Sequence, residues 1–276
     1  MPRGLMSPID QFSYGLLTPV LAYAMSSVGS LLGLLLTARA RLIGGKEGRY
    51  WLVGAALAIG GTGIWTMHFI AMMGFAVDGT DIHYDLPLTA ASALLAVVVV
   101  GMGLFLVFHG GERVSSLVGG GVLTGLGVAG MHYLGMAGMR MAGHVSYDPV
   151  VVGLSVVIAV AAATAALWFA LRVRGALRTT GAALVMGVAV SGMHYTGMYA
   201  MAVQVHSDET PVGGAAAGDF LLPLVVGLSV VTVGLLLAVL LSPSEREVLA
   251  EMKFRERMLR SEGGAPEQDS FGTPRG

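Results

Sequence analysis

The chain has 276 residues, of which 55% are hydrophobic and 12% are charged, and it contains no cysteine. A soluble domain carries about 25% charged residues, so this composition and the mean hydropathy of +0.75 exclude a water-soluble globule. The absence of cysteine excludes disulfides, thiolate metal sites and thiol nucleophiles.

Seven apolar segments are each long enough to cross a bilayer as a helix, which takes about 20 residues. They lie at Tyr14–Thr37, Tyr50–Met73, Leu86–Phe108, Val114–Met141, Val150–Leu171, Thr179–Val203 and Phe220–Leu241. The sequence therefore predicts an all-α polytopic membrane bundle over residues 1–242. Residues 243–276 are predicted to form a short cytoplasmic helix, begun by a capping box at Ser244 and Glu247, and then a disordered tail.

The basic residues predict the orientation of the chain. Fourteen of the sixteen Lys and Arg residues fall in the first, third and fifth loops and in the C-terminal segment, and only Arg3 and Arg140 fall on the other side. Cytoplasmic loops are enriched in Lys and Arg, so the N-terminus is predicted outside and the C-terminus in the cytoplasm. This rule accounts for the basic residues, and no nucleic-acid partner is predicted.

One eight-residue motif occurs three times, at Trp65–Met72, Ala129–Met136 and Ser191–Met198. Each copy contains one histidine: His68, His132 and His194, separated by 64 and 62 residues. This period predicts three helical-hairpin repeats followed by a seventh helix. The three motif helices run in the same direction, so all three histidines are predicted at one depth, about 9 Å below the outer surface at 1.5 Å per residue.

Three ionisable side chains at one depth in a membrane predict a shared site, because such groups are costly in lipid and usually face a partner or a cavity. Methionines accompany each histidine, one directly before it and one four residues after it on the same helix face. The predicted metal ligands are therefore His68, His132, His194, Met67, Met131, Met193, Met72, Met136 and Met198. Imidazole with thioether suits copper, above all Cu(I), although methionines in apolar helices are more often core packing.

Other candidate residues surround the motif. Tyr133 and Tyr195 follow their histidines and either orient a ligand or belong to the aromatic belt of the membrane. The predicted outer loops contain His83, His144 and His206. These histidines either attract cations at the outer surface of the site or, more commonly for such residues, are simply solvated. Two glycine pairs, Gly29 with Gly33 and Gly121 with Gly125, predict close helix packing.

At these residues the sequence resembles the MHYT family of bacterial integral-membrane sensor domains, named for the Met-His-Tyr-Thr motif. Residues 193–196 match the motif completely, residues 131–134 depart from it at Leu134, and residues 67–70 depart at Phe69 and Ile70. The resemblance implies seven spans in the bacterial cytoplasmic membrane, with the motif facing the periplasm or exterior. It also implies a copper cofactor and sensing of oxygen, carbon monoxide or nitric oxide.

Many members of that family carry a cytoplasmic signalling module, and the 34 residues after Ser242 are too few for one. We therefore expect this chain to signal through a separate cytoplasmic partner. No phosphate-binding loop, acid–base pair or Ser-His-Asp set is present in the sequence, so an enzyme is not predicted, although a metal site leaves redox activity open. The alternatives are copper transport, a copper-dependent membrane oxidase or, third, a b-type haem protein.

Overall fold

The computed structural model describes residues 7–110, 113–205, 213–242, 247, 250 and 253–259, and the chain divides into two units, residues 1–239 and 240–276. Within the described residues, six helical segments are long and apolar enough to cross a membrane, as expected of a multi-pass membrane protein. They are Leu17–Ile43 (α1), Gly45–Met73 (α2, η1 and α3), Leu86–His109 (α4), Val114–Ala137 (α5), Pro149–Arg172 (α6) and Ala176–Tyr199 (α7).

The predicted fourth and sixth spans were wrong at their C-terminal ends. They were expected to reach Met141 and Val203, but α5 ends at Ala137 and α7 at Tyr199. The residues that follow pair as strands with neighbouring loops, which satisfies their backbone groups better than a longer helix would. The chain is mostly helical, as predicted, but the all-α description missed these strands. The seventh predicted span lies within α8 (Ala217–Leu241), of which Val226–Leu241 is apolar.

The spans of the first unit form a ring. Helix α1 contacts the second span and α7, α4 contacts the second span and α5, and α6 closes the ring between α5 and α7. Both predicted glycine contacts are confirmed: a Cβ on Gly29 would lie 2.3 Å from the backbone nitrogen of Gly63, and a Cβ on Gly125 would lie 2.4 Å from the Cα of Val160. Because these glycines have no side chain, the backbones of neighbouring spans can pack in direct contact.

The second span is interrupted by a π-helix, η1 (Leu57–Trp65), between α2 (Gly45–Ala56) and α3 (Thr66–Met73). Glycines let this wider helix fit: a Cβ on Gly60 would lie 2.6 Å from the carbonyl oxygen of Ala96 in α4. Trp65 ends the π-helix and donates its indole N–H to Ser92 of α4 at 2.9 Å. This bond anchors the first residue of the first histidine motif to α4.

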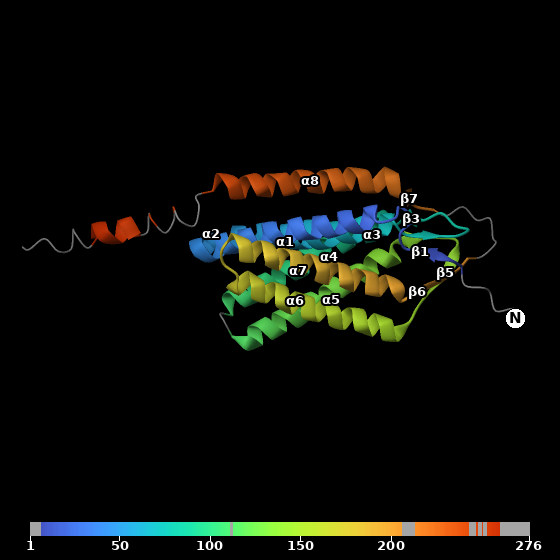
Figure 1. Cartoon of the computed structure of the whole chain (residues 1–276), viewed down its shortest axis with the longest axis horizontal. Coiled ribbons are helices and arrows are strands. Elements are labelled where there is room, and N and C mark those ends of the chain that lie inside the picture. The colour runs from blue at the N-terminus through green and yellow to red at the C-terminus, as the bar shows by residue number, and fades with distance from the viewer. Residues whose placement is uncertain are drawn as a thin grey trace, which may run out of the picture. The chain divides into compact units, whose positions relative to one another are not determined.

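Short strands join the loops at one end of the bundle, where Figure 1 shows the labels of several of them together. The strands are β1 (Ile9–Asp10), β2 (Ala76–Val77), β3 (His83–Tyr84), β4 (Met139–Arg140), β5 (Gly143–Tyr147), β6 (Met201–Val205) and β7 (Ala215–Ala216). All pairings are antiparallel: β1 with β2, β4 with β3, β6 with β5, and β7 with β3. Strands β2, β4 and β6 each follow a motif helix, and each pairs with a strand from another part of the chain. We call the seven strands together the strand cap.

In the second unit, residues 253–259 are helical. The capping-box residue Ser244 and the predicted disordered tail lie outside the described residues.

An ion pair fastens the strand cap to α4. Asp85 precedes α4 and accepts a hydrogen bond from the backbone N–H of Leu88 at 3.1 Å. Arg140 of β4 donates to the other carboxylate oxygen of Asp85. The Arg140 hydrogen bond, helped by the Leu88 N–H, holds the pKa of Asp85 below its ordinary value.

We expect the Asp85→Asn variant to lower the Tm of the detergent-solubilised protein slightly at pH 7. Because the folded pKa of Asp85 is lowered, its stabilisation is complete at neutral pH and disappears as the pH falls below the ordinary Asp pKa of about 3.9 towards the folded value. The Tm difference from wild type should therefore shrink on acidification. Asn still caps a helix, so only the charge pair is lost. The exposed Asp78→Asn is the matched control, and an equal Tm loss there would contradict this role.

Candidate metal centre

The three motif histidines converge in the interior of the bundle. His68 on α3, His132 on α5 and His194 on α7 are 1%, 0% and 1% exposed. The Nδ1 atom of His68 lies 2.9 Å from Nδ1 of His194 and 3.2 Å from Nδ1 of His132. The ring centroids are 4.9, 4.9 and 5.1 Å apart, and the rings stand nearly perpendicular to one another. One ring nitrogen of each histidine therefore lies within 4.8 Å of the other two.

Glycines on the neighbouring motif helices make room for the rings. A Cβ on Gly135 would lie 2.5 Å from Nε2 of His68, and a Cβ on Gly197 would lie 2.3 Å from Nε2 of His132. Gly135 and Gly197 each follow a motif histidine by three residues, so each ring packs against the next motif helix. The equivalent position of the first repeat is Ala71. Aligning the three motif sequences shows that a small residue recurs at this position, but it does not show which histidine ring that residue contacts.

The rings are held by packing rather than by outer hydrogen bonds. Within the described residues, the Nε2 atoms of His68, His132 and His194 have no hydrogen-bond partner. The Tyr133 hydroxyl pairs with Ser155 of α6 at 2.7 Å, and the buried Tyr195 hydroxyl has no partner among the described residues. Neither tyrosine therefore makes a hydroxyl hydrogen bond to the histidines.

All six candidate methionine ligands are buried with the histidine motifs: Met67, Met72, Met131, Met136, Met193 and Met198. Two of them line cavities. Met193 lines an apolar cavity within the bundle, and Met72 lines a pocket of about 210 Å³ beside the strand cap, together with Asp81. Met67 packs in a separate small cluster with Ala22 and Ala71, whereas the other five belong to the main core.

The loop histidines do not join this cluster. His83 lies in β3 opposite Arg140, and the exposed His144 lies in β5 opposite Gln204, in a different sheet. His206 lies outside the described residues.

The donor set fits a metal ion of low charge. Metal–imidazole bonds are about 2.0–2.1 Å long, so three nitrogens around one ion lie roughly 3.3–3.5 Å apart. The two separations that involve His68, 2.9 and 3.2 Å, reach this range after small ring movements, and the ligand atoms of all three residues lie within 4.8 Å of one another. Within the described residues, no carboxylate joins the histidine group. Neutral ligands in an apolar interior favour a monovalent soft cation over a divalent one.

Known proteins match along most of the chain. The MHYT profile, described as a bacterial signalling protein N-terminal repeat, matches three times, at residues 61–120, 125–183 and 187–250. The chain belongs to the MHYT family. Three repeats are thereby confirmed, and each match contains one motif histidine. The prediction of a seventh helix outside the repeats was wrong, because each match runs from a motif helix into the helix that follows it and the third match includes α8. No solved structure matches the chain.

Longer MHYT proteins are among the relatives. The chain is 39% identical over 235 residues to the bifunctional diguanylate cyclase/cyclic di-GMP phosphodiesterase MucR of Pseudomonas aeruginosa, covering 83% of this chain and 34% of that protein. It is 31% identical over 202 residues to the signaling protein YkoW of Bacillus subtilis, covering 70% and 24% respectively. The chain thus spans about a third or less of the length of these relatives, and it is related to signalling proteins.

We expect Gly135→Ala to disturb the histidine cluster while the helix persists. The added methyl group overlaps Nε2 of His68 and must push its ring out of the junction, although alanine is the better helix former. The variant should fold, but its affinity for a soft metal ion such as Cu(I), added to purified protein, should be lower than that of wild type. Gly130→Ala on the same helix is the matched control, because its Cβ meets only a Leu95 methyl at 3.8 Å. Equal Cu(I) affinity in both variants would refute this steric role.

Proposed function

We propose that this MHYT protein is a copper-binding membrane sensor of a diatomic gas: oxygen, carbon monoxide or nitric oxide. The observation that carries the proposal is the meeting of three buried Nδ1 atoms from three repeats. Copper, when bound, supplies a reversible coordination site for a diatomic ligand. His68, His132 and His194 would hold it, and the motif methionines are the candidate additional ligands.

The packing around the histidines supports a mechanical role. The His68 ring lies against Gly135 of α5 and the His132 ring lies against Gly197 of α7, so movement of one ring presses on the next motif helix. The strand cap ties the outer ends of the same helices to one another. A small movement of the histidine rings would therefore shift the three motif helices together. Packed protein interiors switch between a few distinct packing arrangements rather than deforming continuously.

A polar contact links the second span to the last helix. The hydroxyl groups of Thr62 in η1 and Thr232 in α8 are 2.8 Å apart, and Leu228 of α8 lies near Gly61. Helix α8 leads into the C-terminal segment, so this contact offers a route from the first motif helix to a separate cytoplasmic partner. With the predicted topology, the strand cap and the histidines face the periplasm or exterior, α8 forms the seventh span, and the protein lies in the cytoplasmic membrane.

The histidine cluster should be necessary for copper retention. We expect His132→Ala to lose most of the copper found in wild-type protein purified in detergent, because only two of three imidazoles remain, and the triple alanine variant of His68, His132 and His194 to lose all of it. Mass spectrometry measures the metal, and an absorption spectrum tests for the Soret band of a haem. The exposed His144→Ala is the matched control. Unchanged copper in the triple variant would refute the site.

The methionines should tune the affinity for Cu(I). We expect replacement of Met72, Met136 and Met198 by leucine, which conserves volume, to weaken Cu(I) binding in competition with a colorimetric chelator while the fold persists. Met102→Leu, at a position that is 46% exposed, is the control for a general effect of losing thioethers. Unchanged Cu(I) affinity in the triple leucine variant would assign these methionines to core packing.

A further inference from the structure

An apolar cavity lies inside the bundle directly below the histidine cluster. Ile64, Val128 and Val190 all line it, and each precedes a motif histidine by four residues. Residues four apart lie on the same helix face about one turn, or 5.4 Å, from each other. The cavity therefore begins about one turn beneath all three histidine positions.

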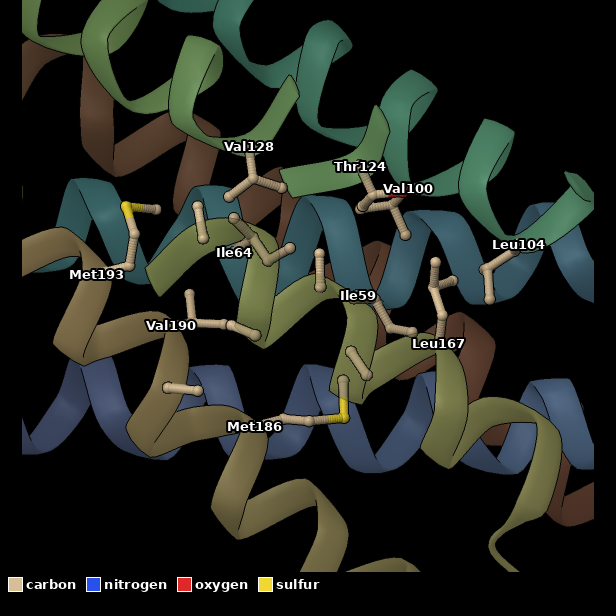
Figure 2. A pocket seen from close by; sticks show the side chains of 15 residues that line it. Ile59, Ile64, Val100, Leu104, Thr124, Val128, Leu167, Met186, Val190 and Met193 are labelled. Atoms are coloured by element: carbon tan, nitrogen blue, oxygen red, sulfur yellow. The ribbon is translucent and has the colours of Figure 1, made fainter. Parts of the chain in front are cut away.

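The cavity exists because one wall is built of small residues. Helix α6 carries no histidine motif, and Ala159, Ala162, Ala163 and Ala166 present one alanine face to the cavity. The larger side chains come from η1, α4, α5 and α7 and, at one end of the α6 wall, from Leu167, as Figure 2 shows. Met193, next to His194, and Leu104 lie at opposite ends in this view. The remaining volume is about 50 Å³.

The lining is suited to an apolar occupant. A water molecule needs about 10–15 Å³ and two to four polar partners, so the space is sufficient for water but the partners are lacking. The one polar side chain in the lining is Thr124, and its hydroxyl already donates to the carbonyl of Val99 at 3.4 Å. Cavities of this kind stay dry and bind apolar gases such as xenon.

We propose that this cavity is a binding site for a diatomic gas, which it concentrates from the lipid and delivers to the three Nδ1 atoms above it. A diatomic molecule is small enough for the space. O2, CO and NO do not require hydrogen bonds, and the apolar walls of the cavity offer none. The identity of the occupant rests on the proposed function, whereas the cavity and its dryness rest on the lining residues alone.

Xenon is the probe that tests the cavity without requiring a metal. In crystals of the full chain pressurised with xenon, we expect a xenon peak among Ile64, Val128 and Val190 in wild type. Ala163→Leu fills the cavity from α6 without replacing any residue of a motif helix, so its peak should be lost. Ala165→Leu is the matched control, because the exposed Ala165 lies on the other face of α6 and is absent from the lining.

If Ala163→Leu does not fold, Ala166→Val adds bulk at the same wall and takes its place. Ordered water in the wild-type cavity, an empty wild-type cavity under xenon, or a xenon peak that survives the filled variant would each overturn the proposal. Copper is measured in the same protein preparation, which separates the two hypotheses. Xenon bound without copper refutes the proposed function and supports the cavity, whereas copper bound without xenon refutes the cavity alone.

Discussion

The arrangement of this protein depends on bringing three imidazole rings into one buried junction. Ring nitrogens at 2.9 and 3.2 Å cannot stay together in an apolar interior without a proton or a cation between them, because an unshared polar atom there costs free energy. The helices that carry the rings must approach closely, and the loops beyond them must be held in place. The glycines beside the rings and the strand cap meet these two requirements.

The same arrangement creates both a polar junction and an apolar space. Above the rings, β2, β4 and β6 follow the motif helices and are paired to other segments, which shields the junction from solvent. Below the rings, the aliphatic residues one turn earlier meet a wall of alanines and leave a cavity. A buried site beside an apolar cavity is reached more easily by a small apolar molecule than by an ion in water.

The repeats are not equivalent, and the first differs most. It has a π-helix before its histidine, Phe69 where the others have tyrosine, and Ala71 where the others have a glycine against a ring. π-Helical segments often mark functional sites, since the extra residue per turn redirects the side chains that follow. Its span is also the one that contacts α8 through Thr62 and Thr232. The first repeat thus combines a histidine of the junction with the link to the C-terminal helix.

Sequence alone predicted the membrane class, the approximate positions of six spans, the presence of three repeats and the histidines of the junction, because hydrophobic length and a 62- to 64-residue period are properties of the chain. It placed the end of the first span six residues too early, at Thr37 rather than Ile43. It did not determine the π-helix, the strand cap or the ends of α5 and α7, which depend on backbone pairing between distant loops. Likewise, Gly135, Gly197 and the alanines of α6 are unremarkable in a glycine- and alanine-rich chain. Only helix packing decided that two of these residues face imidazole rings and that the others leave a cavity beneath them.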